Sequence, residues 1–384
     1  MIKAVLVLRK INNSHWSVPH CSSSKVNRHP KMNKLFLYFG GDIFKNYHDV
    51  FLPTLNIDQD FNIQIISHLN VPSKPEIKDI YLGLLNLLLK TDGEVYHIGY
   101  NQSIREVFSS LKDSHIVDIS YGFDFSYLIT KAEKCYVSSN KDFKPELLVF
   151  LPADCKIKSI VTEDLYTIAL TEDGKVFRLQ ILKEPFIEKL LLPIPIKEIA
   201  CGKEHVLLLS NSGTVFSYGS GSKGQLGHGS IENHKTPELI EALEGLQIKS
   251  VSAGGWHSAA ISDSGDLYMW GWNESGQLGM PCNELQGNKR PMEEIETVCC
   301  LPKIVELEEE NVKSVCCGCR HTVALTEKNH VWTWGWNEYG QLGHKNVKLT
   351  DAPEKIQLPN SLHPLDVKAK FWSTLIIGSM LEKE

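Results

Sequence analysis

Residues 253–279 read Ala253-Gly-Gly-Trp-His-Ser-Ala-Ala-Ile-Ser-Asp-Ser-Gly-Asp-Leu-Tyr-Met-Trp-Gly-Trp-Asn-Glu-Ser-Gly-Gln-Leu-Gly279, and the pattern returns twice. A second copy runs from Gly318 to Gly343, and a weaker one from Gly202 to Gly227. Each copy holds a turn, a His, an apolar run, a second turn, a second apolar run and a glycine-rich loop. A unit that recurs at such spacing is typical of propellers and other repeat folds. The pattern therefore predicts a repeat architecture.

The His of this unit defines an equivalent position in every repeat. Working outward from it, we align Leu85, Phe125, Tyr166, His205, His257, His321 and Ser373. The steps between them are 40, 41, 39, 52, 64 and 52 residues, which suits the four short strands of a propeller blade. Eight residues later comes a hairpin turn such as Ser264-Gly265, where glycine accepts a positive φ at little cost. Alternating apolar runs flank these turns and predict strands.

The two ends of the chain hold complementary parts of one further repeat. Residues 35–41 end on the repeat Gly but lack the preceding turn, whereas residues 371–378 hold that turn and the first apolar run. Joined, they close a ring without an open sheet edge. We therefore predict an all-β, seven-bladed β-propeller over residues 35–384. Its repeats are degenerate over 35–196 and strong over 197–384.

Residues 1–34 are predicted to be a basic, disordered tail. They hold seven Lys or Arg and no Asp or Glu, and prolines interrupt any helix. A mitochondrial transit peptide is a minor alternative for this segment. The whole chain has 40 Lys and Arg against 46 Asp and Glu, so the remaining residues, with 33 against 46, carry a net charge of −13. Such a body disfavours direct nucleic-acid binding and favours a basic partner such as a histone.

The range 280–311 is a long acidic insertion between two strong repeats. It is interpreted either as a solvated loop or as a contact for a basic partner. No apolar run of the chain approaches the roughly 18 residues that a membrane-spanning helix needs, so no membrane association is expected. A monomeric propeller is expected.

Cysteines and histidines could indicate a metal site, but their repeat positions favour structural roles. Five of the ten cysteines lie between 299 and 319, yet Cys317 aligns with Cys201 and Ala253, where a small buried side chain is needed. The three repeat histidines come from equivalent sites of different blades and cannot converge on one ion. We predict instead that His205, His257 and His321 bond the backbone and lock their own blade turns. No metal or cofactor is expected.

The loop glycines are predicted to form turns rather than a phosphate-binding loop, which would need a following Lys-[Ser/Thr]. They are Gly271, Gly276, Gly279, Gly335, Gly340 and Gly343. No Ser/His/Asp set, paired-carboxylate motif or nucleotide fingerprint accompanies them. The chain is therefore not expected to be an enzyme.

Tryptophans at variable repeat positions carry the binding prediction. Trp256 and Trp372 stand where other copies have Glu or Arg, and a position that accepts charge is expected to be exposed. Exposed Trp beside Asn and Glu is typical of binding hot spots. The predicted partner-binding residues are Trp256, Trp272, Asn273, Glu274, Trp336, Asn337, Glu338, Tyr339 and Trp372. Packing between blades is the alternative for the Trp residues, and turn hydrogen bonding is favoured for the Asn residues.

These motifs resemble the repeat of the regulator of chromosome condensation family. Its Gly-x-x-His-[Ser/Thr] turn and Trp-Gly-x-Asn-x-x-Gly-Gln-Leu-Gly loop stand at 254–279 and 318–343. The resemblance implies a seven-bladed propeller. The strong C-terminal repeats and the acidic insertion resemble a small vertebrate-type branch of the family. That branch implies a nuclear or chromosomal adaptor, with a cytoplasmic pool, that assists a JmjC-type dioxygenase.

The roles implied for this adaptor are histone methylation control, chromosome segregation and spindle organisation. The founding branch of the family implies another function, guanine-nucleotide exchange on a Ran-type GTPase. Such an activity works by binding and distorting the GTPase, so it needs no catalytic motif. A structural propeller without a dedicated partner is a third interpretation.

Overall fold

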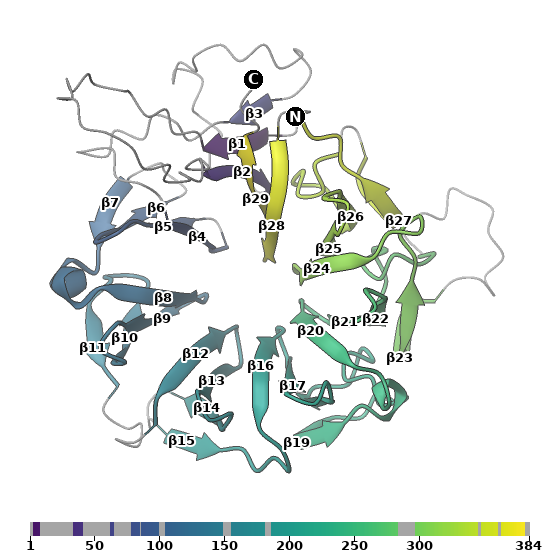
Figure 1. Cartoon of the computed structure of the whole chain (residues 1–384), viewed down its shortest axis with the longest axis horizontal. Helices are drawn as coiled ribbons and strands as arrows, with labels where there is room; N and C mark the ends of the chain where they lie inside the picture. The colour runs from purple at the N-terminus through teal and green to yellow at the C-terminus, as the bar shows by residue number, and fades with distance from the viewer. Residues whose placement is uncertain are drawn as a thin grey trace, which may run out of the picture.

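Seven sheets surround a central axis in the computed structural model, and their strands are antiparallel except for one parallel pair in the five-stranded sheet (Figure 1). It describes residues 3–7, 34–40, 62–64, 78–84, 86–99, 104–148, 155–180, 186–282, 296–344, 347–359 and 362–380. The predicted all-β, seven-bladed propeller is confirmed. In the described part of the chain the helices are the short 3-10 turns η1 (Ser109–Ser114) and η2 (Glu241–Leu243). Neither has the length or apolarity to cross a bilayer.

The six whole blades run from an inner to an outer strand in chain order. Blade one has β4 (Asp79–Leu82), β5 (Leu87–Lys90), β6 (Val95–Ile98) and β7 (Ile104–Val107). Blade two has β8 (Ile116–Tyr121), β9 (Phe125–Thr130), β10 (Cys135–Ser139) and β11 (Pro145–Leu147). Blade three has β12 (Ile157–Thr162), β13 (Thr167–Thr171), β14 (Val176–Gln180) and β15 (Phe186–Lys189).

Blades four to six contain the strong repeats. Blade four has β16 (Ile196–Cys201), β17 (His205–Ser210), β18 (Val215–Gly219) and β19 (His234–Leu239). Blade five has β20 (Ile248–Ala253), β21 (His257–Ser262), β22 (Leu267–Trp272) and β23 (Val298–Val305). Blade six has β24 (Val312–Cys317), β25 (His321–Thr326), β26 (Val331–Trp336) and β27 (Leu349–Lys355). Since β23 lies within 280–311, the acidic range includes blade five's own outer strand.

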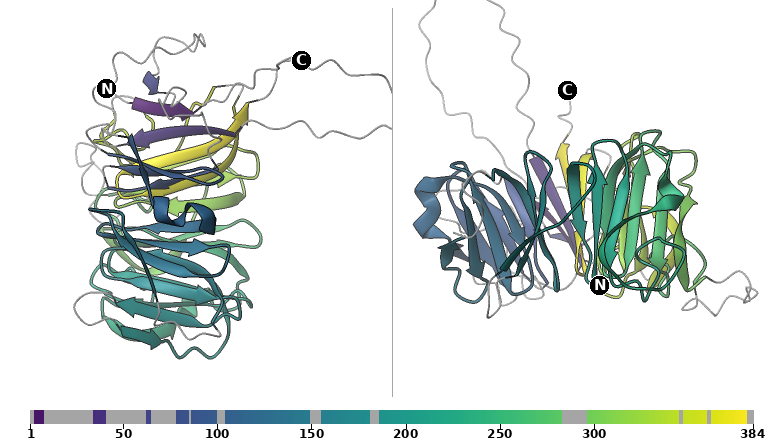
Figure 2. Two further views of the ribbon diagram at one scale, coloured as in Figure 1. Left: turned by 90° about the vertical axis from the view of Figure 1, so that its left-hand side faces the viewer. Right: turned by 90° about the horizontal axis from the view of Figure 1, so that it is seen from below.

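Blade seven combines both ends of the chain, as predicted. It contains β28 (Leu362–Lys370), β29 (Ser373–Met380), β2 (Lys34–Gly40), β1 (Lys3–Val7) and β3 (Asn62–Gln64). In both views of Figure 2 the purple strands from the start of the chain lie beside the yellow strands from its end. Strand β2 pairs antiparallel with β29, which closes the ring.

The prediction of a disordered tail over 1–34 needs correction at β1. Residues 3–7 pair antiparallel with β2, with Ala4 opposite Phe39. The run Lys3–Val7 is rich in β-forming residues, and without it the outer side of β2 would lack this pairing. Residues 8–33 lie outside the described residues.

Strand registers test the repeat alignment directly. His257 lies opposite Gly271, and Ser373 lies opposite Gly40 in the same register. His205 and His321 pair in the same way with Gly219 and Gly335. The aligned positions are thus structurally equivalent across these four blades.

The aligned position in blade one was wrong by one residue. Leu87 pairs with Ile98, and the Gly83 N–H donates to the Asn86 carbonyl, the bond that Gly254 makes to His257. Asn86 is therefore the equivalent residue, and Leu85 lies outside the described residues. The cause is a shorter hairpin. The Thr91 N–H donates to the Glu94 carbonyl three positions later, whereas the equivalent bonds in blades two to six span four positions.

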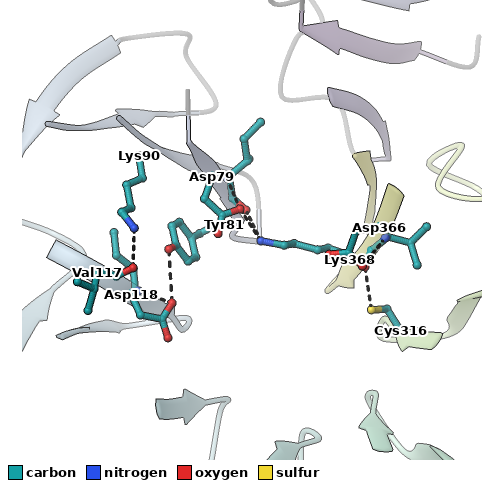
Figure 3. Close-up of polar contacts among 11 residues, drawn as sticks. Asp79, Tyr81, Lys90, Val117, Asp118, Cys316, Asp366 and Lys368 are labelled. Carbon is teal, nitrogen blue, oxygen red and sulfur yellow. Dashed lines mark hydrogen bonds and ion pairs between the residues drawn. The ribbon is translucent and has the colours of Figure 1, made fainter. Parts of the chain in front are cut away.

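The inner strand of blade seven contacts both neighbouring blades (Figure 3). On one side, the Lys368 Nζ lies 2.6 Å from the Asp79 Oδ1 of blade one and 5.3 Å from the centre of the Tyr81 ring. On the other side, the Cys316 thiol of blade six donates to the Val367 carbonyl over 3.2 Å. The closing blade is therefore tied to the ring by polar contacts as well as by its core.

Candidate functional site

The repeat histidines join neighbouring blades. Each ring is fully buried, and its Nε2 lies 2.8–3.0 Å from a hydroxyl oxygen of the next blade. The pairs are His205–Ser258, His257–Thr322 and His321–Thr374. The prediction that each His bonds the backbone of its own turn was therefore wrong in its partner. Neighbouring blades pack against each other around the axis. A polar side chain buried between two blades can therefore bond a residue of the next blade.

Two of these hydroxyls also bond the loop of the preceding blade. Ser258 Oγ and Trp270 Nε1 both donate to the Gln225 carbonyl, over 2.8 and 2.9 Å. Thr322 and Trp334 donate likewise to the Gln277 carbonyl. Because the hydroxyl hydrogens of Ser258 and Thr322 are used in this way, their oxygens accept from the imidazoles. His205 and His257 are then neutral Nε2–H tautomers. Burial lowers the pKa of all three histidines to about 3.

Two loop glycines allow backbones of neighbouring blades to approach. Gly276 has a φ of +76°, and a Cβ there would lie 2.6 Å from the Asp351 Cα and the Thr350 carbonyl oxygen. Gly224, at the equivalent position of blade four, would place a Cβ 3.0 Å from the Cys299 carbonyl oxygen. Turn formation was the predicted role, and the close approach adds a second reason for glycine.

Replacing Gly276 by Ala is expected to lower the free energy of unfolding by about 2–4 kcal/mol, from backbone strain and overpacking together. Gly245→Ala is the matched control, because Gly245 has a φ of +85° and a Cβ added there would meet nothing within 4 Å. It should cost only the left-handed strain of about 1–2 kcal/mol. Urea denaturation measures both. Equal losses for the two variants would contradict a tight contact at Gly276.

Both predicted Asn residues hold their own loops. Asn273 is fully buried; its Nδ2 donates to the Met280 and Glu296 carbonyls, and its Oδ1 accepts from the Leu278 N–H. Asn337 makes the corresponding bonds in blade six. These amides are committed to loop structure, as the sequence favoured, and present no polar atoms to a partner.

The predicted aromatic residues lie in two groups. Trp256 and Trp272 meet edge to face with ring centroids 5.4 Å apart. Trp336, Trp372 and Tyr339 form the second group, with centroids 4.8 Å apart for the two Trp rings and 5.1 Å for Trp336 and Tyr339. Trp272 is buried, which corrects the expectation of exposure, because its neighbours cover it. Trp256, Trp336 and Trp372 are half-buried, and Tyr339 is 52% exposed.

Backbone bonds place these groups on one end of the ring. The Trp272 N–H donates to the Trp256 carbonyl over 2.9 Å, and the Trp336 N–H donates to the Arg320 carbonyl over 2.8 Å. Each bond ties the loop that follows a blade's third strand to the loop that precedes its second strand. Because successive strands run in opposite directions, both loops lie at the same end. We call this end the aromatic face, formed by Trp256, Trp272, Trp336, Tyr339 and Trp372.

Three cations on this face escaped the sequence prediction. Lys203 Nζ lies 5.0 Å from the centre of the Trp256 ring. Lys223 Nζ and Arg320 Cζ lie 5.2 and 4.5 Å from that of Trp272. Lys203 and Lys223 belong to blade four and Arg320 belongs to blade six, whereas both indole rings belong to blade five. No local sequence pattern therefore links these cations to the tryptophans. Glu274 is half-buried and Glu338 is exposed on the same loops.

A cavity of about 310 Å³ lies among the inner strands and their loops, and Lys203 and Trp372 are among its lining residues. Glu163 and Lys370 also line it, and their side chains form an ion pair of 3.0 Å between blades three and seven. Each lies three residues before the aligned position of its own blade, as Gly254 does before His257 in blade five. Burial raises the pKa of the Cys317 thiol, which also lines the cavity, to about 12. Among the described residues, no His, Cys, Asp and Glu group could hold a metal ion.

One contact resembles a catalytic pair but cannot act as one. Ser217 Oγ lies 2.9 Å from His228 Nε2, yet Ser217 is fully buried and its hydroxyl donates to the Leu226 carbonyl. Thr333 and His344 repeat the arrangement in blade six. The recurrence at equivalent loops marks it as part of the blade structure. The aromatic face, by contrast, carries half-buried and exposed aromatic side chains.

Comparison with known proteins identifies the fold family. A profile of the RCC1-like domain matches residues 83–378. RCC1 domain-containing protein 1 of Mus musculus is 39% identical over 234 residues, covering 52% of this chain and 60% of that protein. The Homo sapiens protein is 36% identical over 223 residues, covering 50% and 59%. The chain thus spans about 60% of the length of these relatives.

A solved structure agrees in fold. Prp20p of Saccharomyces cerevisiae, whose structure was described together with its binding to Gsp1p and histones, matches with a TM-score of 0.69 at 19% identity. The match covers 80% of this chain and 83% of Prp20p. Profile, relatives and fold lead to one conclusion: the chain is a β-propeller that belongs to the RCC1-like domain family.

Proposed function

We propose that the chain is a non-catalytic adaptor that binds a protein partner through its aromatic face. The observation that carries this proposal is the gathering of five aromatic side chains at one end of blades five to seven, with Tyr339 52% exposed. Trp, Tyr and Arg are the residues that most often dominate the energy of protein interfaces. A rigid ring holds these side chains in place, so little ordering entropy is lost on binding.

We further infer that the adaptor acts at chromatin and assists a JmjC-type dioxygenase in histone methylation control, chromosome segregation and spindle organisation. Similarity to RCC1 domain-containing protein 1 over half of the chain supports this assignment. Prp20p, the structural neighbour, binds histones. The net charge of −6 suits a histone contact through the acidic surface of the ring. A nuclear or chromosomal location follows from the same proposal.

The test is co-purification from nuclear extract with the Trp256→Ser/Tyr339→Ser/Trp372→Ser variant, read by mass spectrometry. The wild-type chain is expected to retain a JmjC-type dioxygenase, and the variant to lose it at least about tenfold, because the removed rings are the anchors of the interface. Leu147→Ser/Leu191→Ser is the matched control, because both side chains are exposed. Leu147 ends the outer strand β11 and Leu191 follows the outer strand β15, so both lie at the end of the ring opposite the aromatic face. This control should capture the same partners as the wild type.

Two further measurements sharpen this test. The single variant Tyr339→Ser guards against misfolding, because this half-exposed ring can be removed with little loss of core. Unchanged capture by a folded triple variant would contradict the proposed face. Acceleration of guanine-nucleotide release from a Ran-type GTPase by orders of magnitude would instead support the exchange-factor alternative.

A further inference from the structure

Three cations converge on two indole rings of the aromatic face. Lys203 lies over Trp256, while Lys223 and Arg320 both lie over Trp272. The two rings touch, with centroids 5.4 Å apart. We call these five residues the cationic aromatic cluster. Bringing like charges together costs free energy unless an anion balances them.

The described residues balance one of these charges. Lys203 Nζ lies 3.4 Å from the Asp164 Oδ2. In the part of the chain that the structure describes, neither Lys223 nor Arg320 forms an ion pair within 4.0 Å. Glu204 and Glu274 are on neighbouring loop positions but form no such pair either among these residues. Two positive charges are thus held on the face by aromatic contacts.

The indole rings also preorganise these cations. A ring face attracts a cation through its quadrupole and leaves the N–H groups at the cation's periphery free to donate. For Arg320, these donors have the forked geometry that matches a carboxylate through two parallel hydrogen bonds. The three side chains are half-buried, so a ligand can reach them.

We propose that the aromatic face binds an acidic segment of its protein partner, with carboxylates on Lys223 and Arg320 and apolar side chains on Trp336, Tyr339 and Trp372. This inference rests on the proposed function, because it names the chemistry of the partner at the same face. A nucleic acid fits less well. Its phosphates follow a continuous basic track, whereas Asp164, Glu204 and Glu274 interrupt this one.

The test uses the full chain and a short synthetic peptide in which Glu alternates with Leu and Phe, compared with the same peptide carrying Gln for Glu. Isothermal titration calorimetry at low salt is expected to show the Glu peptide binding at least about tenfold more tightly than the Gln peptide. Lys223→Glu/Arg320→Glu should remove this difference. Lys235→Glu/Lys313→Glu, an equal charge change at exposed sites outside the cluster, should keep it. Equal binding of both peptides, or no binding of either, would overturn the inference.

The charge-reversed variant also separates this inference from the adaptor proposal. If nuclear-extract partners depend on Trp256, Tyr339 and Trp372 but remain bound to folded Lys223→Glu/Arg320→Glu, the face binds a partner that is not acidic. If duplex DNA displaces the Glu peptide and binds more tightly, the ligand is a nucleic acid and the inference also fails. Loss of both partner and peptide in the charge-reversed variant supports it.

Discussion

Lowering the pH from about 7 to about 4 is expected to unfold the propeller, because three buried histidines must remain neutral in the folded ring. Burial lowers the pKa of His205, His257 and His321 to about 3, from an ordinary value of 6.5. In the unfolded chain these rings take up protons below about pH 6.5. Their contribution to stability is therefore complete above that pH and is lost as the pH falls toward 3.

The expected slope follows from the number of protons. Each histidine that is protonated only in the unfolded state removes about 1.4 kcal/mol of stability per pH unit. Three together remove about 4 kcal/mol per unit, so a domain stable by about 5–15 kcal/mol unfolds within a few units. Burial also lowers the pKa of His97 to about 4, which acts in the same direction.

A variant series measures this slope. His257→Gln keeps an amide that can donate to the Thr322 hydroxyl but cannot titrate, so the pH slope of the free energy of unfolding should fall by about one proton. The triple variant at His205, His257 and His321 should lose about three. Urea denaturation at a series of pH values gives these slopes. A triple variant that retains the wild-type slope would show that other groups control acid unfolding.

Features that repeat along the chain were predictable from sequence. The spacing of His257 from Gly271 fixes a hairpin, and its recurrence at Ser373 and Gly40 revealed the split blade. These predictions succeed because a strand register depends on residues a few positions apart. Asn86 shows the limit of this logic, because a hairpin shortened by one residue moved the equivalent position away from Leu85.

Contacts between blades were not predictable in the same way. His257 bonds Thr322, 65 residues later, and Arg320 lies over Trp272 of the preceding blade. Neither pairing follows from strand periodicity, since the angle between blades decides which side chains meet. Trp256 and Trp272 were therefore recognised as unusual, while their cation partners were missed and the burial of Trp272 was not foreseen.

Leu37 is expected to be the most sensitive single position for closure of the ring. It is fully buried in β2, lies opposite Ile376 of β29, and packs in one core cluster with Val323 and Val367. Leu37→Ala should cost about 2–5 kcal/mol, as for other large-to-small changes in a core. Leu37→Asp should cost more, because an unpaired carboxylate would be buried among apolar side chains.

Hydrogen exchange can distinguish local opening of the ring at β2 in Leu37→Asp from a general loss of stability. Without β2, strand β29 loses the partner that carries the ring from the end of the chain back to its beginning. Hydrogen exchange in Leu37→Asp is therefore expected to rise first at the amides of β29 and β28, while β17 and β21 of blades four and five stay protected. Leu147→Asp, a change at a 44% exposed residue of β11, is the control and should leave exchange in β29 unchanged. If Leu37→Asp instead raised exchange equally in all blades, the ring would unfold as one unit, because the seams that His205, His257 and His321 bridge would then be no stronger than the closing strand.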